Sequence, residues 1–219
     1  MDIFETIIRF FQTGGAFMYP IAVVLACGLA IAIERYIYLS AAKASNRKAF
    51  DQLLPPLKKR DFPSVLKLAN GSGAPVGRIV GAGISRMGQS RRRDDIENAM
   101  EEGVMEALPR LEKRTPYLAT LANIATLLGL LGTIIGLIAA FTAVANADPT
   151  EKAALLSQSI SVAMNTTAFG LISAIPLLLF HALLQTKTIE IVDSLEMVGV
   201  KVINILAESS SSAKPNEIA

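Results

Sequence analysis

Small and hydroxyl side chains recur at helical spacing along two apolar stretches of this chain. At about 100° per residue, one face of the first stretch collects Thr126, Gly129, Thr133, Gly136, Ala140 and Ala143. The corresponding face of the second collects Ser159, Ala163, Thr166, Gly170 and Ser173. Small faces let helix backbones approach closely in a bilayer, and hydroxyl groups on them can line a polar path. Helix packing alone explains one such stripe, whereas two stripes that both carry threonine favour a polar pathway through the membrane.

The elements that must position these residues are membrane-spanning helices. Of the 219 residues, 52% are hydrophobic, and the mean hydropathy is +0.45. Three apolar stretches reach the roughly 20 residues that a span requires, and the second and third exceed it. We therefore predict an all-α integral membrane protein with transmembrane helices at 14–36, 117–145 and 154–185. The net charge of +2 gives no case for nucleic acid, and a single cysteine excludes an intrachain disulfide.

The first apolar stretch has two interpretations. Its Val24-Leu25-Ala26-Cys27 segment resembles a lipoprotein cleavage site. The residues before it are not basic, however, and the apolar run continues past Cys27, so we predict a span that is retained. Cys27 is then a small apolar packing residue.

Charge predicts the orientation of the spans. Residues 37–116 are rich in lysine and arginine, whereas the turn at 146–153 is short and carries Asp148, Glu151 and Lys152. The positive-inside rule places 37–116 and the tail 186–219 in the cytoplasm, and the segment 1–13 and the turn in the periplasm. Glu34 and Arg35 form a predicted membrane-boundary pair that fixes the inner end of the first span by snorkelling and pairing.

The segment 37–116 is predicted to be a helical cytoplasmic domain. The helix at 50–57 is interrupted by Pro55-Pro56, another starts at Asp61-Phe62-Pro63 and ends at 70–73, and a third covers 76–87. A fourth starts at 94 and continues into the second span as one long helix. The tail beyond Leu206 is predicted to be disordered.

No set of residues typical of catalysis is present, and we do not expect an enzyme. The one His and the one Cys fall in different apolar stretches, and neither a phosphate-binding glycine loop nor metal-ligand spacing occurs. The apolar stretches within the spans, 14–33, 118–144 and 153–185, also contain no carboxylate. A proton or cation relay normally needs an ionisable group within the membrane, so a conducting protein of this kind must obtain it from a partner.

Two runs resemble the MotA/TolQ/ExbB family of bacterial inner-membrane motor subunits. They are ALPRLEKRTPYLATLANIATLLGLLGTIIGLIAAF (Ala107–Phe141) and AMNTTAFGLISAIP (Ala163–Pro176). The first span, GGAFMYPIAVVLACGLAIAIERYIYL (Gly14–Leu39), is similar to that of the ExbB branch. The resemblance implies a homopentamer in the inner membrane around a dimer of a single-span ExbD- or TolR-like partner. It also implies that protons load and unload the partner's transmembrane aspartate opposite Thr133 and Thr167. This proton movement energises a TonB-like protein, and no cofactor is expected.

One departure from the family pattern leaves the ion open. ExbB and TolQ proteins usually carry a glutamate five residues before the second threonine, where this chain has Val162. The pair Thr166-Thr167, with Asn165 before it, looks more like sodium-driven flagellar stators, and hydroxyl and carbonyl oxygens suit Na⁺. Three hypotheses follow: an ExbB-like motor subunit, a TolQ-like or other envelope motor, and a non-conducting scaffold in the bilayer.

Overall fold

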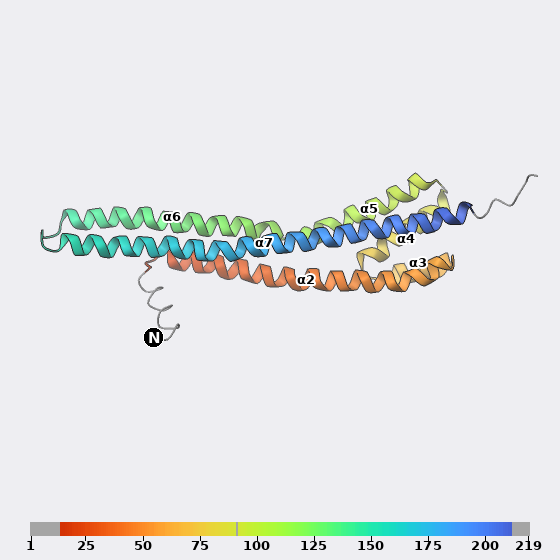
Figure 1. The fold of residues 1–219 in the computed structure, drawn as a ribbon, viewed down its shortest axis with the longest axis horizontal. Coiled ribbons are helices and arrows are strands. Elements are labelled where there is room, and N and C mark those ends of the chain that lie inside the picture. The colour runs from red at the N-terminus through yellow and green to blue at the C-terminus, as the bar shows by residue number, and fades with distance from the viewer. Residues whose placement is uncertain (1–13, 91, 212–219) are drawn as a thin grey trace, which may run out of the picture. The chain divides into compact units, whose positions relative to one another are not determined.

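All regular elements in the described part of the chain are helices. The computed structural model describes residues 14–90 and 92–211, with side chains described as far as Leu206. In chain order the helices are α2 (Met18–Lys58), α3 (Phe62–Gly71), α4 (Pro75–Gln89), α5 (Arg93–Glu112), α6 (Thr115–Ala145) and α7 (Lys152–Ser211) (Figure 1). The prediction of an all-α fold is confirmed, and the segment 1–13 lies outside the described residues.

Three helical stretches are long and apolar enough to cross a membrane. Their most apolar windows have mean hydropathies of 1.8, 2.4 and 2.0, in Met18–Lys58, Arg93–Ala145 and Lys152–Leu206 respectively. The second and third stretches contain the predicted spans at 117–145 and 154–185, and the first begins at Met18, four residues after the start of the predicted span at 14–36. The chain therefore has the composition of a multi-pass membrane protein.

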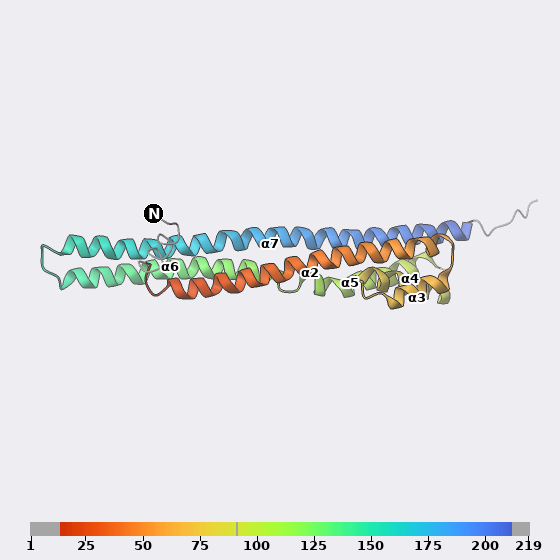
Figure 2. The ribbon, with the colours of Figure 1, turned by 90° about the horizontal axis from the view of Figure 1, so that it is seen from below.

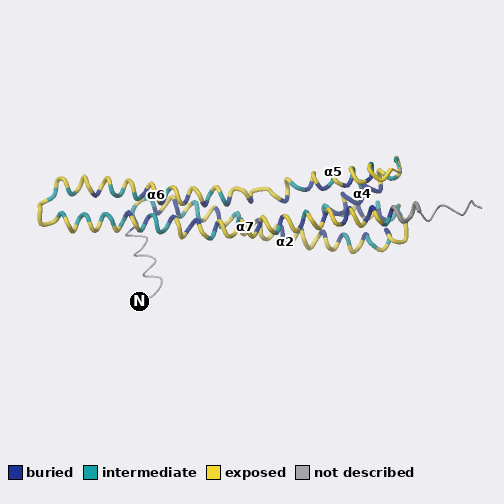
Figure 3. Tube along the Cα trace, turned by 45° about the horizontal axis from the view of Figure 1, so that its top comes forward, coloured by how far each residue is buried: buried dark blue, intermediate teal, exposed yellow. Residues whose placement is uncertain are grey.

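The chain divides into two compact units. The apolar unit comprises residues 1–35 and 114–184, and the charged unit comprises 36–113 and 185–219. In the apolar unit, α6 and α7 run side by side, and the start of α2 lies beside them part-way along their length (Figures 1 and 2). The inner face of α6 buries residues three or four apart, so the burial colour alternates along its trace (Figure 3). Its outer face carries exposed large apolar side chains, such as Leu127 and Phe141.

The charged unit has an apolar core of its own. In α7 the buried residues follow a three- and four-residue spacing, which lays one stripe of the helix against the unit's interior: Ile191, Leu195, Val198 and Val202. Glycines allow α4 and α5 to approach, because a Cβ on Gly103 would lie 3.3 Å from the Cα of Ile79. An exposed ion pair joins Lys43 of α2 to Glu190 of α7 at 2.7 Å, and this hydrogen bond holds the pKa of Glu190 below its ordinary value.

The predicted boundaries of α3 are confirmed. The Asp61 carboxylate accepts a hydrogen bond from the Ser64 N–H at 3.2 Å, and Pro63 occupies the first turn. This hydrogen bond lowers the pKa of Asp61. The helix ends at Gly71, within the predicted stop at 70–73.

The predicted interruption at Pro55-Pro56 is wrong, because α2 continues through both prolines to Lys58. Each proline removes one helical hydrogen bond. Leu53 and Leu57 are nevertheless buried on this turn, so tertiary packing outweighs the local preference.

The predicted continuous helix from 94 into the second span is also wrong. It is broken after Glu112, and Arg114 has a left-handed backbone with φ of 66°. In an unbroken helix the ring of Pro116 would clash with the carbonyl of Glu112 and remove the hydrogen bond to it. The tail predicted to be disordered beyond Leu206 is helical to Ser211, and residues 212–219 lie outside the described residues.

Candidate functional site

Two glycines bring the backbones of α6 and α7 into direct contact. A Cβ on Gly170 would lie 2.7 Å from the Ala125 carbonyl oxygen and 3.0 Å from the Gly129 Cα. A Cβ on Gly129 would in turn lie 3.2 Å from the Cα atoms of both Gly170 and Thr167. No side chain larger than hydrogen fits at either position without moving a helix, so this contact sets the distance between the two helices.

Thr133 of α6 and Thr167 of α7 meet next to this contact. Their hydroxyl groups form a hydrogen bond across the interface. The Thr167 hydroxyl also reaches the Gly129 carbonyl oxygen at 2.8 Å, and the Thr133 hydroxyl reaches the same oxygen at 3.2 Å and the Ala163 carbonyl oxygen at 3.4 Å. The two predicted pathway threonines are thus brought together from opposite helices.

The number of hydroxyl hydrogens limits how this cluster can be connected. Each threonine has one hydrogen to donate and two lone pairs that accept. When Thr167 donates to Gly129, over the shortest of the carbonyl contacts, Thr133 donates to Thr167 and keeps its own lone pairs. In this arrangement the Thr133 oxygen can accept a hydrogen bond from a third group. If Thr167 instead donates to Thr133, the Thr133 hydroxyl can donate to that group. Hydrogen bonds linked in this way strengthen one another in a medium of low dielectric constant.

Thr166, the third predicted pathway residue, faces elsewhere. Its hydroxyl reaches the Gly14 carbonyl oxygen at 2.6 Å and the Val162 carbonyl oxygen at 3.0 Å. The residue is only 2% exposed, whereas Thr133 and Thr167 are half-buried. Adjacent residues on a helix are separated by about 100°, so Thr166 contacts the residues ahead of α2 while Thr167 contacts α6.

The remaining stripe residues differ in burial. Gly136 faces Ala163, since a Cβ there would lie 2.9 Å from the Ala163 Cβ. Ala140 and Ser173 are fully buried, and the Ser173 hydroxyl has no hydrogen-bond partner among the described residues. Two other predicted residues, Ser159 and Asn165, are half-buried. On α6, Thr126 and Ala143 are exposed, and the Thr126 hydroxyl donates to the Ala122 carbonyl of its own helix at 3.1 Å.

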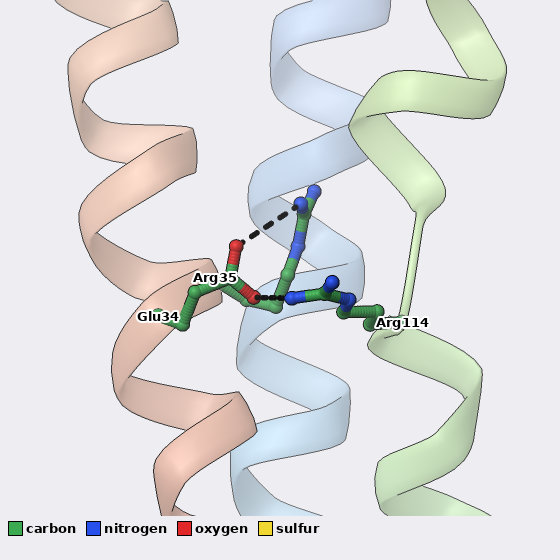
Figure 4. Close-up of polar contacts among 3 residues, drawn as sticks. All are labelled: Glu34, Arg35 and Arg114. Carbon is green, nitrogen blue, oxygen red and sulfur yellow. Dashed lines mark hydrogen bonds and ion pairs between the residues drawn. The ribbon is translucent and has the colours of Figure 1, made fainter.

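The predicted boundary pair acquires a third member. Figure 4 shows the Glu34 carboxylate of α2 between the guanidinium groups of Arg35 and Arg114, at 4.0 Å and 3.5 Å. Arg35 is 2% exposed, whereas the side chains of Glu34 and Arg114 are about half exposed. Arg114 is the residue with the left-handed backbone, so this cluster joins α2 to the start of α6.

Sequence reasoning missed three participants. Gly132 gives room to the Thr166 methyl group, to which a Cβ would come within 2.4 Å. Its place three residues from Gly129 could have revealed it. Arg114 carries no comparable signal, because its partner Glu34 lies 80 residues away. The Gly14 carbonyl is a backbone group that no side-chain pattern reports.

The fold and the site define the class of the protein: a multi-pass helical membrane protein with a hydroxyl pair between two apolar helices. Residues 72–197 match the sequence profile of the MotA/TolQ/ExbB proton channel family. A biopolymer transport protein described as an ExbB homolog, from Methanothermobacter thermautotrophicus, is 28% identical over 200 residues. That alignment covers 90% of this chain and 70% of the relative.

Two further relatives agree with this assignment. A biopolymer transport protein of the ExbB-like kind from Synechocystis is 27% identical over 170 residues, covering 77% of this chain and 80% of the relative. The Tol-Pal system protein TolQ of Haemophilus influenzae is 33% identical over 101 residues, or 42% of this chain and 44% of the relative. The chain belongs to the MotA/TolQ/ExbB proton channel family, which is not an enzyme family.

Proposed function

We propose that this chain is the pentameric subunit of an ion-driven motor of the inner membrane. In this proposal the segment 1–13 and the 146–153 turn are periplasmic, and 37–116 forms a cytoplasmic helical domain. Five copies surround a dimer of a single-span ExbD- or TolR-like protein whose aspartate faces Thr133 and Thr167. The observation that carries the proposal is the hydroxyl pair between α6 and α7, in spans without a carboxylate of their own.

The hydroxyl pair suits a partner carboxyl group in both of its protonation states. A protonated carboxylic acid is a donor, and it matches the arrangement in which Thr133 keeps free lone pairs. An ionised carboxylate only accepts. It matches the reversed direction of hydrogen bonding, in which Thr167 donates to Thr133 and Thr133 donates to the carboxylate. Charge-assisted hydrogen bonds are the stronger ones, so the pair stabilises the ionised state after the proton leaves. Rotating two hydroxyl groups is sufficient to change from one arrangement to the other.

The output we propose is the energising of TonB-dependent transport at the outer membrane through a TonB-like protein. This output is supported by the relatives with ExbB names, and the match to a TolQ protein supports the alternative of a Tol-type envelope motor. A non-conducting scaffold is the third candidate, because the glycine contact between α6 and α7 would serve packing equally well.

Sodium is the alternative to the proton as coupling ion. The Thr133 hydroxyl lies within hydrogen-bond distance of the Gly129 and Ala163 carbonyls, and the Thr167 hydroxyl of the Gly129 carbonyl, so four oxygen atoms gather without a carboxylate. Oxygen ligands of this kind suit a hard cation. Val162, where the family usually carries glutamate, is consistent with either ion.

The decisive experiment replaces one hydroxyl with a methyl group. The chain is co-expressed with the single-span protein encoded beside its gene, and the complex is examined by native mass spectrometry and by ion flux in proteoliposomes. Thr167→Val should leave a pentamer with two partner chains and abolish flux, while Thr167→Ser should retain it. Thr142→Val is the matched control, because the exposed Thr142 hydroxyl donates only to Ile138 of its own helix.

Four outcomes separate the candidates. Flux that follows a pH gradient without sodium supports the proton, and flux that requires sodium supports the alternative ion. Normal flux in the Thr167→Val complex would refute the pathway role of the pair. A wild-type oligomer that neither binds the partner nor carries ions would support the scaffold.

A further inference from the structure

The residues ahead of α2 form a tight turn against the two threonine helices. Gly15 has a φ of 76°, in the region that favours glycine, and α2 begins three residues later. The first N–H of the helix, that of Met18, goes to the Gly15 carbonyl at 3.2 Å. The Gly14 carbonyl is therefore free to accept from another element, and it accepts from Thr166.

The Thr166 hydroxyl donates its one hydrogen mainly to the Gly14 carbonyl. It has one hydrogen, and the Gly14 oxygen at 2.6 Å is closer than the Val162 oxygen at 3.0 Å. The Val162 carbonyl is already the acceptor for the Thr166 backbone N–H in α7. The Gly14 carbonyl depends on the hydroxyl, and burial makes an unpaired carbonyl at this position costly.

Side-chain packing places the same turn against both helices. A Cβ on Gly15 would lie 3.2 Å from the Val162 Cγ1 on α7, and a Cβ on Gly132 of α6 would lie 3.2 Å from the Phe17 Cβ. Thr166 contacts both parts, because its hydroxyl reaches the Gly14 carbonyl and its methyl group lies 2.4 Å from where a Cβ on Gly132 would be, and Thr167 follows it in the sequence. The turn thus covers the flank of α6 and α7 at the level of the hydroxyl pair.

We propose that Thr166 is a positioning residue that holds residues 14–17 as a cap beside the Thr133–Thr167 pair. The cap excludes water from that flank, so that ions meet the pair only through the partner's carboxyl group. Thr166 then anchors the cap, while Thr167 belongs to the pathway. The effect of the cap on ion flow rests on the proposed function. The anchoring itself rests on the contact between Thr166 and Gly14 alone.

Hydrogen exchange of the intact complex in lipid nanodiscs tests the anchor. In Thr166→Val the hydroxyl is replaced by a methyl group of similar shape, and the amides of residues 15–19 should exchange about tenfold faster, equivalent to about 1.4 kcal/mol. Thr166→Ser keeps the hydroxyl and should exchange like the wild type. Thr167→Val is the matched control, because its hydroxyl contacts α6 and not the turn.

Proton leak through the same complexes in vesicles tests the function of the cap. Thr166→Val should raise the uncoupled leak severalfold, and Thr166→Ser should not. Unchanged exchange in Thr166→Val, or equally fast exchange in Thr166→Ser, would overturn the anchor. Faster exchange without added leak, in a complex whose wild type carries ions, would overturn the sealing role. Faster exchange while even the wild type carries no ions would support the anchor and contradict the proposed function instead.

Discussion

Adding one methyl group to the α6–α7 contact should separate the two helices. In Gly170→Ala the new Cβ would lie 2.7 Å from the Ala125 carbonyl oxygen, whereas ordinary contact begins at 3.4 Å, so the helices must move apart by about 0.7 Å. The hydrogen bond from Thr167 to the Gly129 carbonyl, now 2.8 Å, would lengthen to about 3.5 Å. At that length little of the hydrogen bond remains.

The magnitude follows from three opposing effects. Overpacking costs about 1–3 kcal/mol, and the interhelical hydrogen bond contributes about 0.6 kcal/mol. Replacing a helical glycine with alanine returns about 1 kcal/mol through helix propensity. The net loss of about 0.6–2.6 kcal/mol corresponds to a fall in Tm of roughly 1–10 °C for a chain of this length.

Thermal denaturation of the purified oligomer, followed by circular dichroism, measures this effect. Gly88→Ala is the matched control, because Gly88 lies in α4 and a Cβ there meets no atom within 4 Å. The same chemical change should leave that Tm unchanged or raise it slightly. If Gly170→Ala shifts the Tm as Gly88→Ala does, the backbone contact between α6 and α7 is not what the structure describes, and the argument fails.

Three further predictions concern other contacts. Gly136→Leu should prevent assembly, because a Cβ there is already 2.9 Å from the Ala163 Cβ; an intact oligomer in native mass spectrometry would contradict the close approach of this face. Glu34→Gln should lower the Tm by no more than a few degrees, because its shorter ion pair, with Arg114, joins two half-exposed side chains, and 1 M salt should reduce the difference from wild type without abolishing it, because Arg35 is buried. Asp61 has a lowered pKa in the folded chain, so the stability that it contributes is present above the ordinary value of 3.8 and is lost as the pH falls through the folded value. The Tm difference between wild type and Asp61→Ala should therefore shrink in acid, and a difference that grows there would refute the role of the carboxylate as the α3 cap.

Some structural details were readable from local sequence but easily misjudged. Pro116 gives a signal for the break after Glu112, because a proline ring excludes the carbonyl four residues earlier from the helical ladder. The expected single helix from 94 into the second span is therefore two helices in the structure. Pro55 and Pro56 give the same kind of signal, yet there the helix continues, because burial of Leu53 and Leu57 outweighs the two lost hydrogen bonds.

The sequence by itself determined the helical class, the three apolar stretches and the cap of α3. These features depend on length, composition and neighbouring residues, and the thickness of a bilayer converts apolar length directly into a span. Only the tertiary structure decided which threonine meets which group. Thr166 and Thr167 are adjacent, so the rotation of α7 about its axis decides that one binds Gly14 and the other Thr133. That rotation is set by the contacts of Gly170 with Gly129 and Ala125 of the preceding helix, residues too far apart in sequence for a local pattern to encode.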